Sequence, residues 1–174
     1  MNLNQNELKN KFGKNIIFGE NLSKYSWFNI GGPAQVFFKP ESIEQLVEFL
    51  KYIKNSRKII CLGAGSNTLI RDGGFSGVVI KIGSKFSFIK QHKNNILEFG
   101  AATLDKTLSR FAADNSISNF EYLSCIPGSI GGAIRMNSGC FGNEISNNLV
   151  SIKTLDFMGN LKEIEKTKIK FYYR

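Results

Sequence analysis

Residues 58–80, KIICLGAGSNTLIRDGGFSGVVI, carry a glycine-rich loop between two short apolar runs. The runs KIICL (58–62) and FSGVVI (75–80) predict strands, and the first has the continuous apolar character typical of a strand buried on both faces. A strand that runs into Gly-x-Gly-Ser-Asn can curl successive N–H groups into a concave anion site, to which serine and asparagine add donors. The stretch therefore predicts a loop that holds a phosphate or diphosphate, with an ordinary tight turn as the alternative.

The loop departs from two familiar phosphate-binding patterns. A P-loop would end in Gly-Lys-Ser/Thr, which this loop lacks. A dinucleotide-binding GxGxxG fingerprint would need glycine at position 68, where the chain has Thr68. The prediction is therefore an anion-binding loop of neither type.

A second glycine-dense stretch covers residues 125–142. Pro127 fits the first turn of a helix, and the residues after it present a face with few side chains: Ser129, Gly131, Gly132 and Ala133. A flat or extended ligand can lie against such a face because the backbone is accessible. Tight packing of a helix on a strand, without a ligand, is an equally weighted alternative.

Regular elements surround both stretches. Strands are predicted at 35–39, 58–62, 75–80 and 95–101, helices at 41–54 and 103–115, and a hairpin over 149–166 around Met158-Gly159-Asn160. Ser42 with Gln45 predicts a capping box, Thr103 a second N-cap, and Asp105 a carboxylate that favours the helix dipole. The first part reads strand–helix–strand–strand, which predicts an α+β fold with two lobes.

Composition narrows the class of protein. The chain has 174 residues, 42% hydrophobic and 21% charged, which predicts one domain or two small lobes and excludes collagen-like, disordered and coiled-coil classes. The net charge of +9 comes from scattered lysines and arginines without a basic stripe, so we expect a solvated surface and no nucleic-acid partner. The start lacks a secretory signal and no apolar run reaches membrane-spanning length, so we expect no membrane partner and a cytoplasmic location.

Histidine and cysteine usage excludes several kinds of site. His92 is the single histidine and lies in a polar stretch, which leaves no other base for a Ser-His-Asp triad and no multi-histidine metal site. The three cysteines, Cys61, Cys125 and Cys140, are odd in number and lack CxxC spacing, which argues against a disulfide framework and against zinc. We therefore expect no metal.

Four motifs in order resemble one family. SWFNIGGPA (26–34), LGAGSNTLIRDGGFSGVVI (62–80), EYLSCIPGSIGGAIRMNSGCFG (121–142) and FYYR (171–174) are similar to UDP-N-acetylenolpyruvoylglucosamine reductases, the flavoenzymes of peptidoglycan precursor synthesis also known as UDP-N-acetylmuramate dehydrogenases. The resemblance implies an α+β, two-lobed FAD-binding fold of the vanillyl-alcohol-oxidase (PCMH) type. It implies a lead-in over 1–20 and an FAD-binding domain over 21–174, with lobes at about 21–84 and 85–174, and without the family's C-terminal substrate-binding domain.

The resemblance also implies the roles of individual residues. The cofactor-binding set is Gly63, Ala64, Gly65, Ser66, Asn67, Pro127, Gly128, Ser129, Gly131, Gly132, Ala133 and Asn137. Arg174 is implied as the catalytic arginine, whose permanently charged fork can pair with a carboxylate, and Tyr173 as a substrate contact. Cys125 and Asn29 stand where the family usually has glycine and a basic residue.

The implied reaction uses NADPH and FAD. NADPH delivers hydride to FAD, and the reduced cofactor passes it to the enolpyruvyl double bond of a UDP-sugar substrate. The family's proton-donating serine and catalytic glutamate have no counterpart in this sequence. Unless the missing part is supplied, we expect this chain to bind flavin without completing the reduction. Another FAD-dependent oxidase or dehydrogenase of the same superfamily, and a non-catalytic flavin-binding remnant, are the alternatives.

Overall fold

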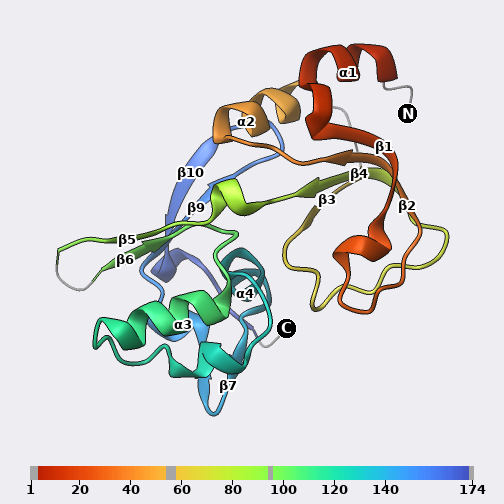
Figure 1. Ribbon diagram of the computed structural model, residues 1–174. Helices are drawn as coiled ribbons and strands as arrows, with labels where there is room; N and C mark the ends of the chain where they lie inside the picture. The colour runs from red at the N-terminus through yellow and green to blue at the C-terminus, as the bar shows by residue number, and fades with distance from the viewer. Residues whose placement is uncertain (1–3, 54–57, 94–95, 173–174) are drawn as a thin grey trace. The chain divides into compact units, whose positions relative to one another are not determined.

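The computed structural model describes residues 4–53, 58–93 and 96–172 (Figure 1). The chain forms two compact units. The first unit comprises Met1–Lys85 and Leu155–Asn160, and the second comprises Phe86–Thr154 and Leu161–Arg174. Each unit has its own hydrophobic clusters, so each is described by itself.

The first unit is built on a four-stranded sheet with the order β1-β2-β4-β3. Its strands are β1 (Ile16–Asn21), β2 (Pro33–Phe38), β3 (Ile59–Leu62) and β4 (Phe75–Lys81). β1 pairs with β2 antiparallel, whereas β2 and β3 both pair with β4 in parallel. The predicted strand–helix–strand–strand order is confirmed by β2, α2 (Ile43–Tyr52), β3 and β4. α1 (Gln5–Phe12) and β1 come in addition to the predicted elements.

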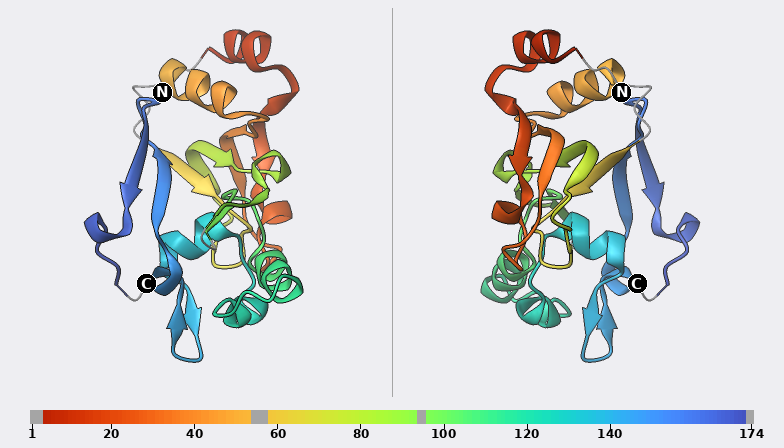
Figure 2. Two further views of the ribbon diagram at one scale, coloured as in Figure 1. Left: turned by 90° about the vertical axis from the view of Figure 1, so that its left-hand side faces the viewer. Right: turned by 90° about the vertical axis from the view of Figure 1, so that its right-hand side faces the viewer.

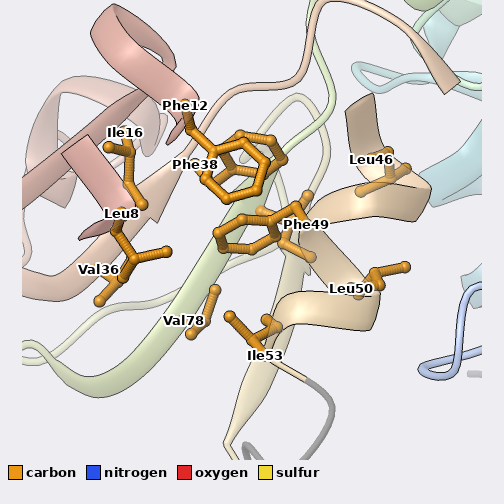
Figure 3. Packing of buried hydrophobic residues seen from close by; sticks show 11 residues of the cluster. Leu8, Phe12, Ile16, Val36, Phe38, Leu46, Phe49, Leu50, Ile53 and Val78 are labelled. Carbon is orange, nitrogen blue, oxygen red and sulfur yellow. The ribbon is translucent and has the colours of Figure 1, made fainter. Parts of the chain in front are cut away.

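α1 and α2 lie close to the sheet of the first unit (Figure 2), and their apolar residues pack into one cluster with those of β2 and β4 (Figure 3). At its centre the rings of Phe38 and Phe49 stack with centroids 3.8 Å apart, and Phe12 meets both edge-on at 5.5 and 5.2 Å. Burying one such side chain contributes about 1.5–3 kcal/mol. The Ser42 half of the capping box is confirmed, because Gln45 N–H donates to Ser42 Oγ at 3.2 Å. The return bond differs from the prediction, because Gln45 Oε1 accepts from the N–H of Glu41 at 2.8 Å, one residue before the N-cap.

A second cluster in the first unit is Leu22, Ala34, Phe37, Leu62, Ile70 and Val79. It joins strand residues to two loops, 22–32 and 63–74, which follow β1 and β3 along the chain. This cluster fixes both loops to the sheet.

The second unit holds two helices, α3 (Asp105–Asp114) and α4 (Ile130–Met136), over the apolar cluster Leu108, Tyr122, Leu123, Ile130, Ala133 and Ile145. Its strands are β5 (Ile89–Gln91), β6 (Leu97–Phe99), β7 (Gly139–Cys140), β8 (Asn143–Glu144), β9 (Ser151–Leu155) and β10 (Leu161–Glu165). They form three two-stranded sheets, and β9 and β10 confirm the predicted hairpin around Gly159.

Short 3₁₀ helices occur in both units. They lie at Gly13–Asn15, Leu22–Tyr25, Ser84–Phe86, Glu121–Cys125, Ile145–Asn148 and Lys166–Lys168.

Two predicted helix starts are wrong. Leu104, not Thr103, is the N-cap residue of α3, because the Thr103 hydroxyl donates to Phe88 O at 3.0 Å and accepts from Phe88 N–H at 3.2 Å. Pro127 lies before the Ser129 N-cap of α4 and is not in its first turn. For Thr103, the contact with Phe88 prevents the capping bond that the local sequence predicts. For Pro127, the connection before α4 is longer than the local sequence predicts.

Candidate functional site

The loop at 63–67 continues β3 beyond its last residue in the first unit. Leu62 lies opposite Lys81 in the β3–β4 register, so the loop leaves the sheet at the carboxyl ends of two parallel strands. Ligands in open parallel sheets bind at this edge because loops and free backbone groups gather there. The position predicted for an anion is therefore at an exposed end of the sheet.

Three carbonyl groups of the loop and the residue after it accept hydrogen bonds from the protein. Gly63 O accepts a hydrogen bond from Lys81 Nζ, Gly65 O accepts from Trp27 N–H at 3.1 Å, and Thr68 O accepts from Ser26 Oγ at 3.1 Å. Within the described part of the chain, none of the N–H groups of residues 64–69 donates to a protein acceptor. A loop in which several carbonyls are occupied and the N–H groups are free is suited to an anion.

Gly65 has a packing role as well as its predicted cofactor role. Its φ of +76° lies in the left-handed region, and a Cβ there would overlap the Tyr25 carbonyl oxygen. The bond from Trp27 N–H to Gly65 O runs beside this contact. Glycine at 65 is therefore required by the chain itself, whether or not a ligand is bound.

The SWFNIGGPA segment lies against this loop. Ser26 and Trp27 supply two of the donors named above, and Trp27, Phe28 and Ile30 keep exposed side chains. Asn29 has φ +55°, a conformation that asparagine tolerates better than most residues, which gives a backbone reason for asparagine at this position. The role of Ser26 and Trp27 in holding the loop is not predicted from the sequence.

The stretch 127–133 belongs to the second unit and uses much of its backbone internally. Ile130 N–H donates to Thr103 O and Gly131 N–H to Ala101 O, each at 2.9 Å. A Cβ on Gly131 would approach the Ala101 Cβ and O at 3.1 Å. Packing between two chain segments, the alternative left open above, therefore accounts for Gly131.

Gly132 differs from its neighbour. A Cβ on Gly132 would meet only Ser129 Oγ, at 3.7 Å, so no described contact of the chain requires glycine there. Ser129 itself is buried, and its hydroxyl caps no amide of α4. Of the two glycines, Gly132 is the one for which a close ligand remains an explanation.

A pair of alanine variants separates these roles. Gly131→Ala is expected to lower the free energy of unfolding by about 1 kcal/mol through crowding against Ala101. Gly132→Ala is expected to keep or raise it by up to about 1 kcal/mol, because alanine is the better helix former, while weakening flavin binding. Thermal melts and flavin titrations of both variants check this. Unchanged flavin affinity in Gly132→Ala would remove Gly132 from the cofactor-binding set.

Asn137 ends α4 in the left-handed conformation, with φ +44°. Its side chain donates to Glu144 Oε2 at 2.7 Å and accepts from Ser146 N–H at 3.4 Å. Both ends of this buried amide are thus used inside the second unit, and its predicted cofactor contact stays a prediction. Tyr173 and Arg174 lie outside the described residues.

Other kinds of site find little support in the described residues. In residues 4–53, 58–93 and 96–172 no group of three or more metal-ligating side chains gathers, and no helix is long and apolar enough to cross a membrane. Cys61, Cys125 and Cys140 are free thiols. The FAD diphosphate, by contrast, is a group that the free amides of residues 64–67 fit.

Comparison with known proteins shows the family of the chain. Residues 34–165 match the FAD binding domain family. A UDP-N-acetylenolpyruvoylglucosamine reductase from Pelagibacter ubique is 47% identical over 168 residues, which cover 97% of this chain and 56% of that protein. The chain thus spans about half the length of this curated relative.

Solved structures add the fold. The crystal structure of UDP-N-acetylenolpyruvylglucosamine reductase from Thermus caldophilus superposes with a TM-score of 0.76 at 27% identity, covering 91% of this chain and 55% of that one. An alkyldihydroxyacetonephosphate synthase superposes with a TM-score of 0.62 at 17% identity, over 92% of this chain and 37% of that one, and so shares the fold alone. The predicted α+β FAD-binding fold is confirmed, as is the resemblance to UDP-N-acetylenolpyruvoylglucosamine reductases. This chain belongs to the FAD binding domain family.

Proposed function

We propose that this chain binds FAD and that the amides of residues 64–67 hold the diphosphate of the cofactor. The observation that carries the proposal is the polarity of the loop, in which the carbonyls of Gly63, Gly65 and Thr68 are occupied and the N–H groups of the described loop are free. Ser66 Oγ and the Asn67 side chain add donors at the same place.

We further propose that the chain is the flavin-binding part of a reductase that converts UDP-N-acetylglucosamine-enolpyruvate to UDP-N-acetylmuramate in the cytoplasm. The support is the name and the 47% identity of the Pelagibacter ubique relative. FAD, when bound, would supply the hydride chemistry by accepting hydride from NADPH and passing it to the enolpyruvyl double bond. In this proposal Arg174 would pair with negative charge on the substrate, and Tyr173 would be a substrate contact.

In this function the protein binds the diphosphate of the cofactor and neutralises its negative charge. A diphosphate carries negative charge that must lose part of its hydration on binding, and aimed N–H groups replace the lost water. Because the loop is held at its carbonyls, its amides need little rearrangement when the anion arrives. Preorganised donors of this kind give affinity without an ordering cost.

The first experiment is a flavin titration of the purified chain. FAD fluorescence quenching and the visible absorbance spectrum are expected to show saturable binding, and ADP, which carries the same diphosphate, is expected to compete. Riboflavin, which lacks the diphosphate, should bind far more weakly. Absence of FAD binding, or equal affinity for riboflavin, would contradict the proposed diphosphate site.

The second experiment tests the reaction. The chain joined to the remaining half of the Pelagibacter ubique relative is expected to oxidise NADPH in the presence of the enolpyruvyl UDP-sugar. FAD binding without any turnover in this fusion would instead favour a non-catalytic flavin-binding protein.

A further inference from the structure

Lys81 is the last residue of β4 and reaches back to the start of the candidate loop. Its ammonium donates to Gly63 O, and its backbone lies opposite Leu62, the residue before Gly63. Phe38, the last residue of β2, lies opposite Ile80, so Lys39 directly follows β2 and lies near Lys81, whose charge it influences. One lysine at the end of β4 and one directly after the neighbouring parallel strand β2 thus lie at the edge from which the loop departs.

The bond to Gly63 O fixes more than one atom. A peptide unit is planar, and in its trans form the C=O and the following N–H point in opposite directions. The Gly63–Ala64 bond is trans, as are the other peptide bonds of the described residues. Holding Gly63 O toward Lys81 therefore turns the N–H of Ala64 away from Lys81, and no described acceptor takes that N–H.

The charge of the two lysines is not balanced by an ion pair in the described part of the chain. Burial, and to a lesser extent the charge of Lys39, lower the pKa of Lys81 from its usual range. Among the described residues no carboxylate forms an ion pair with either lysine, although other surface lysines such as Lys11 and Lys153 have such partners. A half-buried ammonium beside a second ammonium is unfavourable unless an anion approaches.

We propose that Lys81 is a positioning residue for the cofactor diphosphate: it sets the plane of the Gly63–Ala64 peptide and so presents the Ala64 N–H to the anion. Lys39 adds positive charge at the same edge without touching the loop carbonyl. This inference rests on the proposed function, because it takes FAD to be the ligand. It adds a residue that contacts the loop from 18 positions away in the sequence.

The test compares Lys81→Met, Lys81→Arg and Lys39→Met by FAD titration, with a thermal melt of each apoprotein. Lys81→Met is expected to weaken FAD binding at least about tenfold, and Lys81→Arg to stay within about threefold of the unaltered chain, because arginine keeps a charged donor. Lys39→Met removes the same charge but no contact with Gly63, so it is expected to cost about threefold or less. Lys81→Gln replaces Lys81→Met if the latter does not fold.

Nuclear magnetic resonance of the Ala64 amide supplies a local readout. In the unaltered chain the Ala64 N–H is expected to shift when FAD is added; in Lys81→Met this shift should shrink while that of the Ser66 N–H remains. Equal losses of affinity in Lys81→Met and Lys39→Met would show that charge alone matters and overturn the positioning role, as would an Ala64 shift that is unchanged in Lys81→Met. If the unaltered chain binds no FAD, the proposed function is wrong and this inference is wrong with it.

Discussion

Gly65→Val is expected to abolish FAD binding and to lower the melting temperature of the apoprotein. The Cβ of any other residue would overlap the Tyr25 carbonyl oxygen, and φ +76° is strained for a β-branched side chain. Left-handed strain costs about 1–2 kcal/mol and the forced movement of the Tyr25 backbone adds a similar amount. A total of about 3 kcal/mol corresponds to about 6–12 °C in a domain of this size.

The matched control is Gly73→Val in the same loop. A Cβ on Gly73 meets nothing within 4 Å, so the same substitution there should leave both the melting temperature and the FAD affinity near those of the unaltered chain. Thermal melts followed by circular dichroism, with and without FAD, make the comparison. Equal melting temperatures for the two variants would show that Tyr25 does not constrain the loop.

Asp105→Asn is expected to stabilise the protein at neutral and alkaline pH. The Asp105 carboxyl is fully buried at the start of α3, and in the described structure neither of its oxygens has a hydrogen-bond partner. Burial raises its pKa from 3.8 to about 7. From the sequence, this carboxylate is predicted to favour the helix dipole, but the loss of water outweighs that gain in the folded chain.

The sign of the pH dependence follows from the raised pKa. Between about pH 4 and pH 7 the folded chain holds a proton that the unfolded chain has lost, so the free energy of unfolding falls as pH rises. The total change across this window is a few kcal/mol, and it levels off above about pH 7. Asparagine keeps the shape and does not ionise, so the variant should lack this slope.

Denaturant unfolding at several pH values between 4 and 8 measures the effect. Asp114→Asn, at the exposed far end of the same helix, serves as the control and should leave the slope as it is. Tyr122 belongs to the same environment: its hydroxyl is also unpartnered among the described atoms, and burial, with the charge of Asp105 next in importance, raises its pKa to about 12. Identical pH profiles for Asp105→Asn and the unaltered chain would show that Asp105 is not the titrating group.

The sequence predicts the elements whose signal is local. α2 has apolar residues at helical spacing and a real Ser42 cap, and β2, β3 and β4 are short apolar runs, so all four are found where expected. α1 has only Leu8 and Phe12 buried in an otherwise polar segment, because what stabilises it is contact with Phe38 and Phe49, far along the chain. Long-range packing of this kind leaves no periodicity to read.

In the candidate site, too, the local motif is predicted from the sequence and the long-range contacts are not. The order Gly-Ala-Gly-Ser-Asn is visible in the sequence and predicts an anion loop, but the occupied carbonyls depend on Ser26, Trp27 and Lys81. Their positions beside the loop follow from strand register and from loop closure, which no short motif encodes. Gly131 and Gly132 are equivalent in the sequence and differ only in what lies beside each Cβ position.

The placement of α1 matters for anyone who shortens the protein. A designer who trims the polar first fifteen residues as a dispensable tail would also remove Leu8 and Phe12, which are almost completely shielded from water. The stacked rings of Phe38 and Phe49 would become exposed to solvent, and Tyr52 would lose its 2.6 Å hydrogen bond to Glu7. Such a shortened protein should therefore aggregate more readily and melt at a lower temperature, even though its flavin loop is intact.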